Sequence, residues 1–197
     1  GGENDGKSRQ LARYINKMTT TYMPEMNPMM VYRLDRFGRG GHHKPFNDLG
    51  FPGVRIMEAH ENYVQQHQDV RKENGIQYGD MLKFVNFDYA EKLTAVNAIS
   101  MANLAWAPPQ PENVKIGGMV EGSVRLAWDA VEDDDLRGYK IYFRKTTSAT
   151  WDNARFVGKK TEFTLDGIVI DNYLFGIASI DQEGHESVVV FPSEVMR

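Results

Sequence analysis

The 197-residue chain contains no cysteine, and this absence removes several kinds of chemistry together. Without thiols the chain can form no disulfide, no thiolate nucleophile and no zinc site of the cysteine type. We therefore expect the ligands of any metal ion held here to be histidine, aspartate or glutamate.

Long apolar runs and an excess of basic residues are absent as well. No run reaches the roughly 20 residues that a membrane-spanning helix needs, and the polar start GGENDGKSRQ does not have the pattern of a signal peptide. The 23 basic residues stand against 27 acidic ones, for a net charge of −4. A chain without a broad basic field is not expected to bind nucleic acid or an anionic membrane. Since it has no initiator methionine, we expect a cut or processed product.

The character of the sequence changes at LAWAPPQPENVKI, residues 104–116. Pro108, Pro109 and Pro111 cannot continue a helix and favour an extended connector. Upstream of them, helical patterns alternate with short apolar runs, whereas short strand-like runs separated by turn residues follow downstream. We therefore predict two parts, residues 1–108 and residues 109–197.

The first part has the pattern of an α/β domain, or of the end of one. A helix is expected near residue 8, with Ser8 as its N-cap, and a long amphipathic helix is expected to begin at Asn86 or Asp88. A short helix over residues 43–50 would close at Gly50.

Two apolar runs between these helices predict strands at residues 29–36 and 51–58. Two strands are too few for a sheet that buries both faces, so we expect residues 1–108 to be an incomplete portion of a larger domain. The methionines of YMPEMNPMM (residues 22–30) raise the question of a soft-metal site, and we interpret them as hydrophobic filler beside the first strand.

The sequence of the second part predicts an all-β, immunoglobulin-like sandwich of seven short strands. The expected strands are ENVKIGG, SVRLAWDA, YKIYFRK, ARFVGK, EFTLDG, YLFGIASID and SVVVFP. The stretches RLAWDA, LRGYKIYFR and TLDGIVIDNYLFGIASIDQEGHES resemble a fibronectin type III domain over residues 109–197. Such a resemblance implies a fold, while modules of this fold serve as binders, spacers or packing partners.

Polar residues gather within residues 35–71, where four of the five histidines of the chain lie. Each one alone is typical of a solvated loop, but together they could converge as metal ligands. His67 and Asp69 are two residues apart, so an extended backbone would point both side chains the same way. The residue pattern leaves both interpretations open for the group His42, His43, Glu58, His60, His67 and Asp69.

The stretch GGHHKPFNDLGFPGVRIMEAHENYVQQHQD resembles the C-terminal part of the co-catalytic zinc aminopeptidases. That family includes aminopeptidase Y, bacterial leucyl aminopeptidases and the glutamate carboxypeptidase II group. The motifs GHH, KPF, GFPG, RIME and HQD occur in the order of the family, and FDYAEKLTAVNAISMANLA resembles its closing helix. The resemblance covers about residues 7–107. It implies a secreted or periplasmic enzyme that uses two zinc ions to remove N-terminal residues from peptide substrates.

Carried over position by position, the resemblance implies that His67 is a zinc ligand. Asp69 would orient the loop or the imidazole, and His43 would lie beside the site without contacting the metal. Gln66 corresponds to a position from which some members assist the developing oxyanion. His42 stands where the family usually has an aspartate, and an imidazole does not replace a carboxylate as a pure acceptor.

The remaining ligands of the family, and the glutamate that acts as its general base, belong to motifs that precede anything in this sequence; no Glu-Glu pair is present. We therefore expect a fragment of a zinc aminopeptidase that is inactive as an isolated chain. Two alternatives stay open. One is a non-catalytic module that binds a protein or a glycan. The other is one chain of a cleaved enzyme, docked on its own N-terminal fragment or assembled as a homo-oligomer.

Overall fold

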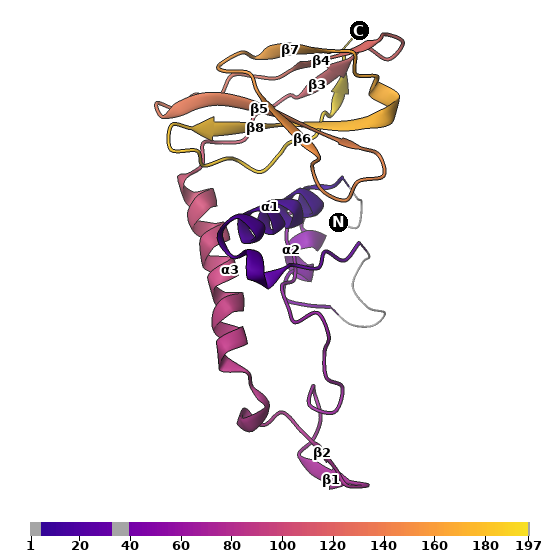
Figure 1. The fold of residues 1–197 in the computed structure, drawn as a ribbon, viewed down its shortest axis with the longest axis vertical. Helices are drawn as coiled ribbons and strands as arrows, with labels where there is room; N and C mark the ends of the chain where they lie inside the picture. Colours follow the sequence, from indigo (N-terminus) through magenta and orange to yellow (C-terminus); the bar gives the residue numbers. More distant parts are fainter. Residues whose placement is uncertain (1–4, 33–39, 197) are drawn as a thin grey trace.

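The structure, a computed structural model, describes residues 5–32 and 40–196. Figure 1 shows an elongated molecule with a β-sandwich at one end, one helix against it, a short helix beside that one, and a long helix that runs towards a small hairpin at the other end. The helices are α1 (Lys7–Tyr22), α2 (Lys44–Asp48) and α3 (Phe87–Trp106), with 3-10 turns η1 (Pro24–Met26), η2 (Leu82–Phe84) and η3 (Ile170–Asn172). The strands are β1 (Arg71–Glu73), β2 (Ile76–Tyr78), β3 (Lys115–Gly117), β4 (Ser123–Ala127), β5 (Leu136–Lys145), β6 (Asn153–Phe156), β7 (Glu162–Asp166), β8 (Tyr173–Asp181) and β9 (Glu194–Val195).

The two long helices form where the apolar spacing predicts them, but one of them starts differently. The side chain of Asn86 accepts a hydrogen bond from the backbone N–H of Tyr89 at 3.0 Å, so Asn86 rather than Asp88 caps α3. The prediction of Ser8 as the cap of α1 is wrong, because Gly6 occupies that position without a side-chain cap. Ser8 lies in the first turn, where its hydroxyl is available to bind another segment.

The two strands predicted in the first part do not form among the residues that the structure describes. Residues 51–58 form no strand, and neither do residues 29–32, while residues 33–36 lie outside the described ranges. In the described part of residues 5–108 the sheet structure is the β1–β2 hairpin. An extended segment becomes a stable strand only when a neighbouring strand pairs with its backbone, and no strand among the described residues pairs with these two segments.

The prediction of a β-sandwich is confirmed. One sheet has the order β7-β4-β3-β9 and the other the order β6-β5-β8, and their inner faces share one apolar core. Side chains from both sheets fill this core, among them Val124, Leu126, Trp128, Tyr139, Ile141, Leu165, Phe175 and Ile177.

The last predicted strand forms only in part. Residues 187–192 contribute one isolated bridge, Ile177 with Val190, and the final paired segment is β9, which lies parallel to β3. Pro192 has no backbone N–H to donate, so regular pairing stops there and the chain crosses to the other sheet.

Helix α1 covers the outer face of the β6-β5-β8 sheet (Figure 1). As a result β8 is buried over most of its length, on both faces, and β5 is mostly buried. The face of α1 that meets the sheet is polar: the guanidinium Nε of Arg13 donates to the carbonyl of Ala149 at 2.8 Å, and Lys17 pairs with Glu186 at 2.7 Å. Within the described residues no helix has the length and apolar content that crossing a bilayer requires.

Candidate functional site

The loop around α2 is held against α1 through Ser8. Its hydroxyl oxygen accepts a hydrogen bond from the backbone N–H of Gly53 at 3.2 Å and another from the Asn47 amide at 3.3 Å. Helix α2 ends at Asp48, and Gly50, two residues later, closes it with φ 86°, a left-handed conformation that glycine adopts without strain. The prediction that a short helix closes at Gly50 is therefore confirmed, and α1 fixes the position of the segment that follows it.

His43 immediately precedes α2 and is half-buried, whereas His42 is exposed. The Nδ1 atom of His43 is buried without a hydrogen-bond partner among the described residues. Gly41 makes room for the ring, since a Cβ at that position would lie 2.8 Å from this nitrogen. The structure thus places His43 firmly while leaving one of its polar atoms unsatisfied.

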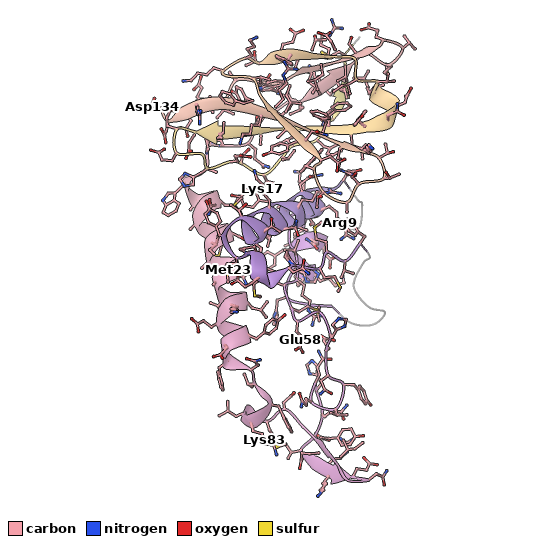
Figure 2. All side chains as sticks on the ribbon, in the orientation of Figure 1. Arg9, Lys17, Met23, Glu58, Lys83 and Asp134 are labelled. Carbon is pink, nitrogen blue, oxygen red and sulfur yellow. The ribbon has the colours of Figure 1, made fainter. Side chains whose placement is uncertain are left out.

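Residues 58–66 cross from the α2 region towards the hairpin. Glu58 and His60 are exposed, and Figure 2 shows Glu58 on the extended segment that runs beside α3. The amide of Gln66 donates to Glu61 at 2.6 Å, and Glu61 also pairs with Arg55 at 3.2 Å. Gln66 is therefore held by a carboxylate, which restricts the orientation of its amide.

His67 is exposed and lies in an unusual backbone conformation, with φ 51°. Left-handed φ values are uncommon for residues other than glycine. Here the Asp80 carboxylate stabilises the backbone, since it accepts a hydrogen bond from the N–H of His67 at 3.2 Å. The sequence does not point to Asp80 as a partner of His67. Asp80 lies thirteen residues after His67, in a triplet, YGD, whose pattern indicates only a turn.

The expectation of an extended segment from His67 to Asp69 is wrong, because His67 turns the chain. Asp69 is exposed, and the guanidinium of Arg71 lies 3.5 Å from its carbonyl oxygen. The tight turn is closed from the other side by Gly79, where a Cβ would lie 2.8 Å from the backbone of Val70. The loop that carries His67 is thus shaped by backbone contacts with the segment that follows the hairpin.

The described residues do not by themselves form a zinc site around His67. Among them, the group of three potential ligands that lies close enough for one ion is in the sandwich and consists of Asp135, Asp181 and Glu183. Both carboxylate oxygens of Asp181 already have hydrogen-bond partners within the chain. One accepts from the backbone N–H groups of Gly184 and His185 at 2.6 and 2.7 Å, and the other lies 2.6 Å from Nδ1 of the His185 ring. Burial raises the pKa of Asp181 but these hydrogen bonds outweigh it, so the net shift is downward. The acidic group stabilises a turn.

Large apolar side chains are exposed mainly in the first part of the chain. Sixteen of the twenty-one exposed large hydrophobic residues that the structure describes lie between residues 22 and 106, and Leu49, Leu82 and Tyr63 are each more than 70% exposed. An excess of exposed large apolar side chains is typical of a part of a protein that contacts other polypeptide. The sandwich, by contrast, has few such residues.

Comparison with known proteins finds relatives over nearly the whole chain, while no protein-family model matches it. A protein of Pyrenophora tritici-repentis (strain Pt-1C-BFP) named "Probable zinc metalloprotease" is 39% identical over 195 residues, which cover 98% of this chain and 45% of the relative. A protein of Leptosphaeria maculans with the same description is 39% identical over 193 residues, or 98% of this chain and 44% of the relative. The chain therefore spans less than half the length of these relatives.

Among solved structures, the fibronectin type III domain of human collagen alpha-1(XX) chain aligns with 44% of this chain and 82% of its own length, at 15% identity and a TM-score of 0.37. Titin module A71 from human cardiac muscle aligns with 42% of this chain and 84% of its own length, at 23% identity and a TM-score of 0.35. At these low scores the sandwich architecture rests on the strand pairing of this chain alone.

Proposed function

We propose that this chain is a portion of a zinc-dependent aminopeptidase and that the rest of the polypeptide completes its active site. The observation that carries the proposal is the 39% identity, over 98% of the chain, to a longer protein named as a zinc metalloprotease. The finer assignment to aminopeptidases rests on the ordered motifs from GHH to HQD. The substrates would be peptides with a free N-terminus, and the working enzyme would be secreted.

The exposed apolar residues support the idea of a missing partner segment. Leu49, Phe51 and Leu82 are at least 60% exposed in a chain whose sandwich buries its apolar residues well. Burying such side chains is worth about 1.5–3 kcal/mol each, so a polypeptide that covers them would be held strongly.

Within this arrangement His67 is the residue proposed to bind zinc, as one ligand of a site that other segments complete. Because His67 is exposed, its imidazole is accessible. The hydrogen bond from its backbone N–H to Asp80 fixes the position of the backbone that carries the side chain. Asp69 and His43 are proposed as supporting residues, and Gln66 would need to leave Glu61 to act on a substrate oxygen. Glu58, His42 and His60 are exposed and remain available for secondary roles.

The test measures zinc content and peptidase activity with and without the missing segment. This chain would be refolded together with the portion of the Pyrenophora tritici-repentis relative to which it does not align. We expect the pair to hold about two zinc ions by elemental analysis and to hydrolyse leucine p-nitroanilide, while the chain alone holds little zinc and is inactive. His67→Ala should lower both zinc content and activity of the pair.

The matched control is His185→Asn, which removes the one histidine that lies outside residues 42–67. It should leave zinc content and turnover unchanged. Turnover by the isolated chain, or a zinc content of the pair that does not respond to His67→Ala, would contradict the proposal. A pair that associates but holds no zinc would favour a non-catalytic module.

A further inference from the structure

The loop that carries His67 is held in a conformation that histidine adopts at a cost. His67 ends the turn of residues 63–67 and has φ 51°, in the left-handed region that residues other than glycine mostly avoid. Such a conformation persists only where surrounding contacts enforce it, and it occurs often at functional sites. His67 is also exposed, so burial of its side chain does not account for the conformation. The contacts that enforce it are therefore to be sought on the backbone.

Two neighbouring residues, Gly79 and Asp80, hold this turn. The backbone N–H of Gly79 donates to the carbonyl of Val64 at 3.1 Å, and a carboxylate oxygen of Asp80 accepts from the N–H of His67 at 3.2 Å. The start and the end of the turn are thus tied to one short segment. The bond to Asp80 engages the main chain of His67 rather than its imidazole. It therefore fixes the direction in which the side chain leaves the backbone without occupying a ring nitrogen.

The β1–β2 hairpin brings Asp80 back to His67. Its turn residues Asn74 and Gly75 have φ values of 50° and 81°, the pattern of a two-residue hairpin turn in which both residues are left-handed. Arg71 pairs with Tyr78, and the Arg71 guanidinium lies 4.1 Å from the centre of the Tyr78 ring. A two-stranded hairpin is marginally stable in isolation, so a cation–π contact of this kind supports it. Because the strands pair in this register, the chain returns after Tyr78 to the turn that it left before Arg71.

We propose that Asp80 is a positioning residue for zinc binding by His67. This inference rests on the proposed function, because it takes His67 as a zinc ligand. A hydrogen bond from an N–H to a carboxylate is charge-assisted and about twice as strong as one between neutral groups, so Asp80 is suited to hold a strained main chain. Residues that contact a metal ligand rather than the metal commonly change metal affinity by about 10–100-fold when they are mutated. Asp80 acts in this way through the backbone of the ligand.

The experiment measures the zinc affinity of the refolded pair described above, by competition with the chromophoric chelator 4-(2-pyridylazo)resorcinol. Asp80→Ala should weaken zinc binding at least about tenfold. Asp80→Asn keeps a side-chain oxygen that can accept from the N–H of His67, so it should restore most of the lost affinity. In a pair that already carries His67→Ala, Asp80→Ala should cause no further loss, because the residue through which it acts is gone.

A second measurement follows the backbone of the 197-residue chain in the absence of zinc. Hydrogen exchange of the His67 amide, observed by NMR, should be at least about tenfold faster in Asp80→Ala than in the unmodified chain. The matched control for both measurements is Glu91→Ala, which removes another exposed carboxylate, on α3. It should change neither the zinc affinity nor the exchange of the His67 amide. Circular dichroism would verify that each variant keeps its fold.

The outcomes separate this inference from the proposed function. An unmodified pair that holds no zinc would overturn the proposed function and this inference with it. A pair that holds zinc with an affinity unaffected by Asp80→Ala would overturn this inference alone. So would a loss that adds in full to that of His67→Ala, since Asp80 would then act independently of His67. A loss that Asp80→Asn does not restore would indicate that the carboxylate contacts zinc directly, and would also contradict the positioning role.

Discussion

The contact between α1 and the sandwich depends on Glu186, and replacing it with glutamine should destabilise the folded chain. The Glu186 side chain is only 7% exposed and binds three groups: the ammonium groups of Lys17 and Lys140 and the hydroxyl of Tyr142. Lys17 also donates to the oxygen of Tyr142 at 2.8 Å. Burial beside Glu186 raises the pKa of Tyr142, so its hydroxyl remains protonated and donates.

The expected magnitude follows from these contacts. A hydrogen bond to a charged group contributes about 1.5–3 kcal/mol, and breaking a buried ion pair can cost about 3–5 kcal/mol. The share of Lys17 must be discounted, because its side chain is 40% exposed and can turn to water. Glutamine also keeps one acceptor oxygen. We therefore expect Glu186→Gln to lower the free energy of unfolding by about 2–4 kcal/mol, or Tm by roughly 5–15 °C for a chain of this length.

The same network predicts a dependence on pH. Burial raises the pKa of Glu186, whereas the two lysines and the tyrosine hydroxyl lower it. The lowering effect is the larger, so the net shift of the pKa is downward in the folded chain. Acid then protonates this carboxyl in the unfolded chain first. Its contribution to stability is complete above the ordinary glutamate pKa of about 4.3 and is lost as the pH falls from there through the lower folded value.

Thermal unfolding followed by circular dichroism at pH 7 and at pH 3 would measure both effects. The difference in Tm between the unmodified chain and Glu186→Gln should be large at pH 7 and small at pH 3. Glu162→Gln, at an exposed position on β7, is the matched control and should change Tm little at either pH. A difference of less than about 1 °C at pH 7, or one that does not shrink in acid, would refute the reasoning.

Two further predictions concern local backbone chemistry. Gly118 has φ 100°, and a Cβ there would lie 2.2 Å from the carbonyl oxygen of Ser123, so Gly118→Ala should cost more than about 1 kcal/mol by chemical denaturation. Gly122→Ala, where a Cβ meets nothing within 4 Å, is its control, and equal stability of the two variants would contradict the steric argument. Asn86→Ala removes the cap of α3 and should lower the free energy of unfolding by about 1 kcal/mol. Its control, Asn97→Ala on the exposed side of α3, should not. A loss below about 0.3 kcal/mol in Asn86→Ala would contradict the role of Asn86 as the cap.

The sandwich could be predicted from the sequence because its strands bury each other. The alternation of Val124, Leu126 and Trp128 is the pattern of a strand with one buried face, and all three are in the core. The strands expected at residues 29–36 and 51–58 have apolar residues too, but alternation indicates only that a segment could pair. Pairing requires neighbours, and for residues 29–32 and 51–58 the described chain provides none.

The site was less predictable, because its shape depends on contacts between distant polar residues. The motif around His67 makes this residue a candidate ligand but does not predict its backbone conformation, which depends on a hydrogen bond to Asp80. Ser8 has the residue type of a helix cap, yet its hydroxyl binds Gly53, forty-five residues further on. Small polar side chains have several equivalent partners, and sequence alone does not tell which one the fold brings near.

The position of α1 shows that two parts of a chain with different sequence patterns need not be independently stable. The prolines near residue 109 mark a change in the pattern of the chain, and the linker there is itself anchored, since the Ser179 hydroxyl donates to the carbonyl of Pro109 at 2.6 Å. Yet Arg13 of α1 is 96% buried by its contact with the sandwich and neighbouring segments. A charged residue is buried in this way only when its partners are present. Helix α1 therefore belongs energetically to the sandwich as well as to the first part of the chain, where it contacts α3 and the loop after α2, and loss of the sandwich should destabilise α1.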